Sequence, residues 1–504
     1  MIKKLIPVLA IASTLSFAAC HESDAPYEFH LSSSVIVTGF SLSEDEKVLD
    51  SLENVFFSID LVEAKIYNAD SLPYGTKVSR LVPVISTPST ASMVQLEYPR
   101  PGMSDSIVDY LTNSTDSIDF SNGPVKLRVK SQSGMVERVY EIKVNVHQVK
   151  ADTLAWYSVE SAPLPTSMAR PDAQRTVEFG GTYYCLTSKD TEYSLATTAN
   201  PADPNWQNKA VAFGFDAKVE SLRATDDALY ILDKDGALYT STDFATWTST
   251  GQTWHYAYGK YGNQLIGCKQ EGGKWVIANY PENKTWIMPA NFPISGTSEP
   301  ACYTPYMGTA MQLVMTGGRT AEGNTLAGSW SFDGQSWAYV TLQSMPYALE
   351  DMAMVPYAIF ETSSSNWVPT EVPALLAFGG RDANGSINPL VLYSLDWGMS
   401  WQKAPTLMQM PESLPKVWGA SAFVYSTEMS DAESRAGDWT KVGHRGLFPQ
   451  CAWPWEIAAS RVSKPVTEWE CPAIYMLGGR NYFGETQTSM WRGVILRYTF
   501  KPLY

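Results

Sequence analysis

The chain is poor in charged residues and in histidine. Of its 504 residues only 18% are Asp, Glu, Lys or Arg, and five are His. Globular proteins carry about 25% charged residues, and disordered or coiled-coil chains are rich in them, so this composition excludes both classes. The net charge is −15, and no local cluster of Lys or Arg offsets it. Because an acidic surface repels phosphate, we do not expect nucleic acid as a partner.

Cysteine is also scarce, and its spacing offers no metal site. The six cysteines form no CxxC pair and the histidines show no paired spacing, so we expect neither a metal nor a cofactor. In an oxidising compartment the candidate disulfide joins Cys451 and Cys471, which flank a loop. Buried free thiols are the alternative. The sequence also lacks the GxSxG, HExxH and phosphate-loop motifs, which argues against common hydrolase and nucleotide chemistries.

No apolar run reaches the ~18 residues of a transmembrane helix. The longest, from Leu5 to Phe17, follows two lysines and precedes Ala18-Ala19-Cys20, as in a secretory signal. Phe17-Ala18-Ala19-Cys20 resembles a bacterial lipobox, which implies a signal peptide over 1–19, lipidation of Cys20 and a tether over 20–33. Plain secretion is the alternative. The acidic residues after Cys20 resemble a Bacteroidetes export signal, so we expect an outer-membrane, surface-exposed lipoprotein that contacts the membrane through its lipid only.

Turn formers and aromatics are abundant, with 34 Gly, 31 Pro, 27 Tyr and 17 Trp, and they favour an all-β chain. Residues 34–149 contain short β-prone runs separated by turn residues. The runs at 125–129 and 140–146 alternate between apolar and polar residues, as half-buried strands do. This length and spacing predict an Ig-like β-sandwich. The stretch 66–76 resembles Ig-like domains that follow the lipidated cysteine in Bacteroidetes surface lipoproteins.

Beyond residue 152, six tryptophans recur in similar contexts at intervals of 39 to 64 residues. They are Trp156, Trp206, Trp247, Trp286, Trp337 and Trp401. These intervals scatter around the ~40–50 residues of a four-stranded propeller blade. In the segment that ends at Trp247 we expect strands at 219–223, 228–232 and 237–241, with an Asp-Gly hairpin between the last two.

The last repeat contains three strands but no tryptophan strand after them. Residues 154–159, around Trp156, match the missing fourth strand by context. The sequence therefore predicts that residues 152–504 form a six-bladed β-propeller closed by its N-terminal strand. In this arrangement the six tryptophans have a structural role.

Two motifs connect this domain with known propellers. Gly-Gly-Arg follows an apolar strand at 317–319, 379–381 and 478–480, and resembles the paired glycines of kelch repeats. Residues 394–401 resemble the Asp-box of sialidase-like propellers, with partial copies at 241–247 and 331–337. Together with the Ig-like module, these motifs resemble a family of Bacteroidales lipoproteins with an N-terminal Ig-like domain and a C-terminal kelch-like/Asp-box β-propeller.

The candidate ligand-binding residues fall into two groups. Arg319, Arg381 and Arg480 occupy matching positions in three repeats, where they either hold an anion or bond to the adjacent blade. The long segment between Ser426 and Cys471 supplies the second group, Trp439, Trp453 and Trp455, either as a binding surface or as a small core.

No set of residues meets the requirements of a catalytic site. We therefore expect a non-catalytic propeller that binds a glycan or a protein, with no catalytic residue assigned. The alternative, which the Asp-box resemblance implies, is a sialidase-like or other glycoside hydrolase that uses the channel mouth. The Arg-Ile-Pro signature of sialidases is absent.

Overall fold

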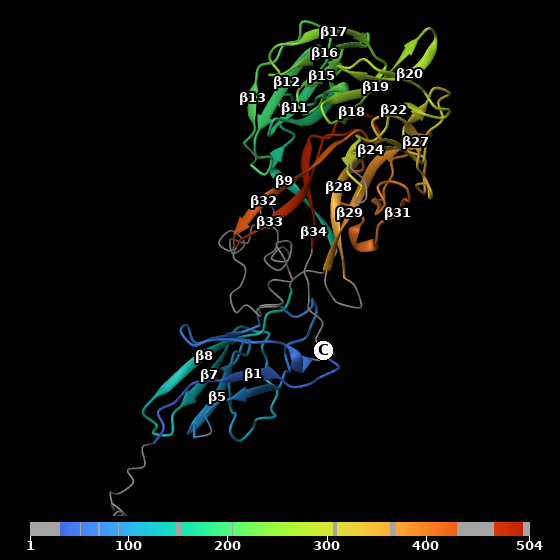
Figure 1. Cartoon of the computed structure of the whole chain (residues 1–504). Helices are drawn as coiled ribbons and strands as arrows, with labels where there is room; N and C mark the ends of the chain where they lie inside the picture. The colour runs from blue at the N-terminus through green and yellow to red at the C-terminus, as the bar shows by residue number, and fades with distance from the viewer. Residues whose placement is uncertain are drawn as a thin grey trace, which may run out of the picture. The chain divides into compact units, whose positions relative to one another are not determined.

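The protein is all-β (Figure 1). A computed structural model describes residues 31–50, 52–68, 71–88, 90–147, 153–203, 205–305, 310–362, 369–430 and 468–496. Besides strands, these residues form three short 3₁₀ helices, η1(Leu52–Asn54), η2(Val219–Ser221) and η3(Thr406–Met408). Within these ranges no helix combines the length and the apolar character needed to cross a membrane.

The described chain divides into two compact units. Residues 31–68 and 77–144 form the N-terminal unit, and residues 71–76 and 145–496 form the C-terminal unit.

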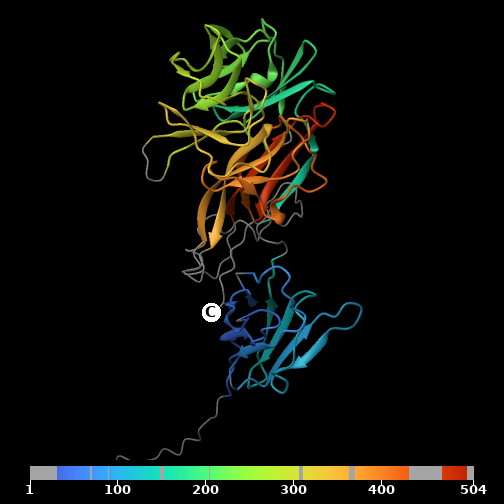
Figure 2. The same cartoon turned by 90° about the vertical axis from the view of Figure 1, so that its right-hand side faces the viewer.

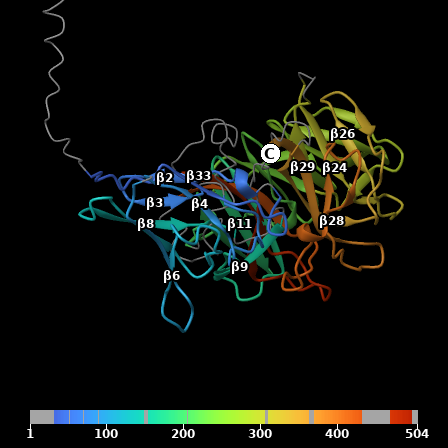
Figure 3. The ribbon, with the colours of Figure 1, turned by 90° about the horizontal axis from the view of Figure 1, so that it is seen from below.

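The N-terminal unit contains a six-stranded sheet and a two-stranded sheet (Figure 3). The large sheet has the order β2(Ser58–Asp60), β3(Lys65–Tyr67), β8(Glu137–Lys143), β7(Val125–Lys130), β5(Met93–Tyr98) and β6(Ser106–Asp109). The small sheet pairs β1(Gly39–Leu42) with β4(Pro83–Ser86). β3 and β8 run parallel, whereas the other pairs are antiparallel.

Period-two alternation determines which face of the large sheet is buried. On β7, Val125, Leu127 and Val129 are fully buried, while the residues between them are more exposed. On β8, Tyr140 and Ile142 are fully buried, so the two strands turn their apolar side chains to the same core. The strands predicted at 125–129 and 140–146 are thus present, the second shifted toward the N-terminus.

The C-terminal unit contains six four-stranded antiparallel sheets among the described strands. Sheet one consists of β10(Ala173–Phe179), β11(Thr182–Lys189), β12(Glu192–Thr198) and β13(Gln207–Lys209). Sheet two consists of β14(Arg223–Ala224), β15(Leu229–Leu232), β16(Ala237–Ser241) and β17(Thr248–Thr253). Sheet three consists of β18(Tyr256–Tyr261), β19(Gln264–Glu271), β20(Lys274–Tyr280) and β21(Thr285–Ile287). Sheet four consists of β23(Ala301–Tyr303), β24(Gln312–Thr316), β26(Ser329–Phe332) and β27(Trp337–Tyr339). Sheet five consists of β28(Glu350–Thr362), β29(Pro369–Arg381), β30(Leu392–Ser394) and β31(Gln402–Lys403). Sheet six consists of β32(Ser421–Ser430), β33(Glu468–Leu477), β34(Ser489–Leu496) and β9(Thr153–Pro163). A short ladder also joins β22(Pro293–Ser295) to β25(Arg319–Thr320). None of these sheets closes on itself.

Sheet six combines strands from the two ends of the unit. β9 pairs antiparallel with β34, with Trp156 opposite Gly493 and Ala155 opposite Val494 (Figures 1 and 2). The strand around Trp156 is thus a neighbour of the last strand of the unit, as the sequence predicted for this pair of segments.

Apolar clusters join the sheets to one another. Each of six buried clusters combines residues of two sheets, five of them between sheets that are consecutive in the chain. The sixth joins sheet six to sheet one, where Tyr183 and Cys185 on β11 pack with Tyr475 and Leu477 on β33. The hydrophobic core of the unit therefore lies between sheets rather than at one centre.

The six repeated tryptophans all lie at the outermost strand of a sheet or one residue before it. Trp156 and Trp206 are buried, Trp401 is fully buried, and the other three are partly buried. Trp401 packs between sheets four and five, and its Nε1 donates a hydrogen bond to Ser329 Oγ at 2.9 Å. In the turn before it, Asp396 Oδ1 accepts hydrogen bonds from Ser400 N and Ser394 Oγ.

The paired glycines adopt a backbone conformation that other residues rarely adopt. Gly317, Gly379 and Gly478 all have positive φ angles. A Cβ on Gly317 would lie 2.4 Å from Leu349 O, and one on Gly379 would lie 2.3 Å from Val417 O. Only glycine accommodates this approach of one sheet to the chain that enters the next.

One predicted strand is wrong. Residues 219–221 form the 3₁₀ helix η2, and the first strand of sheet two is only Arg223–Ala224. Val219 and Leu222 are both buried, and a three-residue spacing places two side chains on one face of a 3₁₀ helix. Apolar residues at this spacing do not distinguish the two structures in so short a segment.

Replacing Trp401 by Ala should lower the free energy of unfolding by about 3–5 kcal/mol, because it leaves a cavity between two sheets. Urea denaturation monitored by circular dichroism measures this loss. The control is Tyr482→Ala, since Tyr482 is 74% exposed and its loss should cost about 0.5 kcal/mol or less. Equal stability of the two variants would contradict the interior position of Trp401.

Candidate functional site

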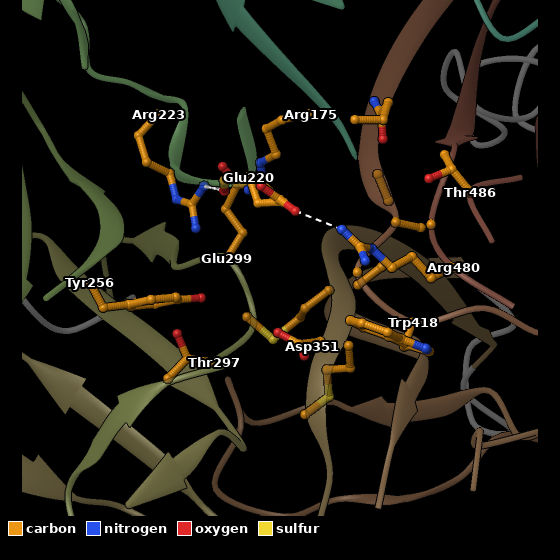
Figure 4. Close-up of a pocket in the computed structure, with 18 residues that line it drawn as sticks. Arg175, Glu220, Arg223, Tyr256, Thr297, Glu299, Asp351, Trp418, Arg480 and Thr486 are labelled. Atoms are coloured by element: carbon orange, nitrogen blue, oxygen red, sulfur yellow. Dashed lines mark hydrogen bonds and ion pairs between the residues drawn. The ribbon is translucent and has the colours of Figure 1, made fainter. Parts of the chain in front are cut away.

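A polar cavity of about 260 Å³ lies in the C-terminal unit. Figure 4 shows the charged and aromatic side chains around an open space, with Arg223 and Tyr256 on one side and Arg480 and Trp418 on the other. Glu299 and Asp351 also line it. Basic, acidic, hydroxyl and aromatic groups therefore face one volume.

The first strand of most sheets contributes side chains to the wall of this cavity. β10 supplies Arg175, β14 supplies Arg223, β18 supplies Tyr256 and β28 supplies Asp351. These opening strands lie next to one another, since β10 contacts β14 and β32, and β14 contacts β18. The cavity is thus built where the first strands of five of the six sheets approach one another.

Every carboxylate in the cavity wall forms an ion pair. Glu299 accepts from Arg175 Nη2 at 2.8 Å, and Glu220 accepts from Arg480 Nη2 at 2.8 Å. Asp351 Oδ2 lies 3.3 Å from Arg381 Nη2. The first two pairs join parts of the chain from different sheets, and they position the guanidinium groups of Arg175 and Arg480 that line the cavity. Asp351 and Arg381 lie on neighbouring strands of sheet five.

Asp351 occupies an unusual backbone position. Its φ is 53°, its N–H donates to Gly296 O at 2.7 Å, and its carbonyl accepts from Gly419 N at 2.7 Å. Burial raises the pKa of its carboxyl, and the neighbouring charge of Glu350 adds to the effect, while Arg381 opposes it. A residue with a strained backbone, whose carboxyl has a raised pKa and lines a cavity, is typical of a functional position.

The three arginines selected from the sequence do not meet at one anion site. Arg319 and Arg381 both pair with Glu350, which is 3% exposed, at 2.7 and 3.0 Å. Arg381 also stacks on Trp418, with its Cζ 3.7 Å from the ring centroid. Arg480 lines the cavity, whereas neither Arg319 nor Arg381 does. Two of the three therefore stabilise contacts between sheets.

Four cavity residues were not predicted from the sequence, namely Arg175, Arg223, Tyr256 and Trp418. A usable signal was present for the first two, because each is a lone arginine in the short strand that opens a repeat. Trp418 carried no such signal, since nothing in its local sequence separates it from the blade tryptophans.

Several predicted residues lie outside the described part of the chain. These are Cys20, Trp439, Trp453, Trp455 and Cys451. Among the described cysteines, Cys185 and Cys268 are buried free thiols and Cys302 is a partly buried one. Within the described ranges, no group of three His, Cys, Asp or Glu side chains could hold a metal ion.

Both units match known domain families. Residues 150–503 match the DUF6242 beta propeller domain, and residues 32–144 match the DUF6242 N-terminal domain. No curated protein is significantly similar to the chain.

Solved structures resemble the chain at low identity. A six-bladed β-propeller lectin from the fungus Aleuria aurantia is 10% identical, with a TM-score of 0.33, covering 67% of this chain and 99% of the lectin. A DUF4784 family protein from Bacteroides caccae is 12% identical, with a TM-score of 0.24, covering 75% of this chain and 97% of that protein. These values say nothing of a shared ligand or activity.

Replacing Asp351 by Asn should change how stability depends on pH. The folded state keeps the proton of Asp351 to a higher pH than the unfolded state, so its ionisation destabilises the fold as the pH rises above 3.8, the ordinary pKa. The Asn variant cannot ionise, and Asn tolerates a positive φ. Relative to the original protein, its free energy of unfolding should therefore rise with pH.

Urea titrations between acidic and neutral pH measure this difference. A difference that stays constant, or that moves in favour of the original protein as the pH rises, would show that the pKa of Asp351 is not raised.

Proposed function

We propose that this chain, which belongs to the DUF6242 family and has that family's N-terminal domain and β-propeller domain, is a cell-envelope lipoprotein whose propeller binds a glycan without turnover. The proposed ligand site is the cavity lined by Arg175, Arg223, Tyr256, Asp351 and Arg480.

The proposed architecture is a six-bladed, kelch-like propeller closed by β9, preceded by an Ig-like sandwich. The pairing of β9 with β34 and the apolar cluster between sheets six and one support this closure. The positive φ angles of the paired glycines support the kelch-like type. Two sheets with an alternating buried face support the sandwich.

The proposed location is the surface of a bacterial outer membrane. Its support is the lipobox-like sequence that ends at Cys20 and the polar, acidic residues that follow. This part of the proposal rests on sequence alone, because residues 1–30 lie outside the described chain.

The observation that favours a glycan is the mixture of groups around the cavity. Sugar hydroxyls both donate and accept hydrogen bonds, and the wall offers guanidinium donors, carboxylate acceptors and the hydroxyl of Tyr256. Its volume of about 260 Å³ is below the ~300–1,000 Å³ of a typical ligand pocket. A single sugar unit at the end of a glycan therefore suits it better than a protein segment.

A glycoside hydrolase is the second candidate, and Asp351 is the observation that favours it. A carboxyl with a raised pKa in a cavity is the form that a general acid takes. Against it, Glu220 and Glu299, the other carboxylates in the wall, are both held by arginines. Chromogenic glycosides distinguish the two functions, because a hydrolase releases the chromophore whereas a binding protein does not.

A bulky side chain at the cavity rim should remove glycan binding. Thr486 lines the cavity and is partly exposed, so Thr486→Trp should obstruct it with little effect on the fold. Glycans that bind the full chain on an array should lose affinity by about tenfold or more in this variant.

The matched control is Thr488→Trp, because Thr488 is exposed and does not line the cavity. Loss of binding in both variants, or in neither, would place the glycan site elsewhere. If no glycan binds the full chain, the proposed function is wrong.

A further inference from the structure

Arg223 is a buried cation without an ionic partner. It is 4% exposed, and its Nε donates to Tyr258 O at 3.0 Å. Its Nη1 donates to Glu220 O and Leu222 O at 2.8 and 2.9 Å. Among the described residues, no carboxylate forms an ion pair with it. Figure 4 shows the guanidinium pointing toward Tyr256 at the open space.

This lack of a partner is specific to Arg223. The other two arginines in the wall are neutralised, Arg175 by Glu299 and Arg480 by Glu220. The third carboxylate of the cavity wall, that of Asp351, forms an ion pair with Arg381. Once these pairs are formed, the wall keeps one uncompensated positive charge, although the whole chain has a net charge of −15.

Burial lowers the pKa of Arg223 to about 10, and the nearby charge of Arg175 adds to this effect. Arg223 is therefore still protonated at neutral pH. Buried charges are ordinarily paired, because the loss of hydration is otherwise costly. A second unsatisfied group lines the same cavity, since Thr297 is 6% exposed and its Oγ1 has no hydrogen-bond partner among the described residues.

From this arrangement we propose that the cavity selects an anionic sugar unit, whose carboxylate or sulfate group pairs with Arg223. This inference rests on the proposed glycan-binding function and specifies its ligand class. The guanidinium group presents several N–H donors in one plane, which suits both anions.

Probes that differ at one carbon test this selectivity. We would titrate the full chain with galactose, galacturonate and galactose 6-sulfate, and with the corresponding glucose series. The acidic members should bind at least about tenfold more tightly than the neutral sugar, since hydrogen bonds to charged groups are the stronger ones. A preference for galacturonate or for the 6-sulfate identifies which anion the site takes.

The variants Arg223→Gln and Arg223→Lys identify the residue responsible. The Gln variant should bind acidic and neutral sugars equally, whereas the Lys variant should retain part of the preference. Thermal melting checks that both variants fold. If the Gln variant does not fold, titrations of the original protein at increasing NaCl concentrations serve as the test instead. Added NaCl should weaken the binding of the acidic sugars and leave the binding of the neutral sugars unchanged.

The outcomes separate this inference from the proposed function. Equal affinity for acidic and neutral sugars, or an acidic preference that survives in Arg223→Gln, would overturn the role of Arg223 and leave glycan binding intact. If none of the sugars binds, and the array shows no glycan ligand either, both proposals are wrong.

Discussion

The antiparallel pairing of β9 with β34 is the contact on which the C-terminal unit depends. It joins segments separated by more than 300 residues, so the closure of this long loop has a large entropic cost. The apolar clusters between sheets offset this cost, since each sheet covers the face of the next. Trp156 belongs to one of these clusters and also lies against Gly493 on β34, so one side chain stabilises both the strand pairing and the packing between sheets.

The same arrangement gives the cavity its chemistry. The packed faces between the sheets are apolar, whereas the opening strands that meet at the cavity carry arginine, aspartate and tyrosine. Ion pairs hold these groups in place, two of them between sheets and one within sheet five. Since only Arg223 lacks an ionic partner there, the rigid wall keeps a positive charge available to a ligand.

The sequence contained enough information for the repeats but not for the site. Tryptophan spacing, Asp-Gly turns and paired glycines are local signals, and they predicted the all-β propeller class of the unit. The cavity combines side chains from strands far apart in the chain, as in the contact between Arg480 and Glu220, and no local pattern encodes such a pair. Arg319, Arg381 and Arg480 occupy matching positions in the repeats, so the sequence grouped them. Glu350, the ionic partner of the first two, is not part of the repeated motif, and the sequence therefore gave no sign of this difference.

In the N-terminal unit the sequence predicted β7 and β8 but not β5 and β6. On β5 a usable signal was present, because the fully buried Val94 and Leu96 alternate with less buried residues. On β6 an exposed apolar residue obscures the pattern. Ile107 on β6 is 62% exposed, so its hydrophobicity gives no information about the buried face.

A double-mutant cycle between Gly493 and Trp156 tests the β9–β34 contact most directly. A Cβ on Gly493 would lie 2.9 Å from the Trp156 ring, so Gly493→Ala should lower the free energy of unfolding by about 1–3 kcal/mol. In a Trp156→Ala background the same change should cost much less, because the ring that it meets is gone. An equal cost in both backgrounds would contradict the packing of Trp156 against β34, and with it the joining of the two ends of the unit.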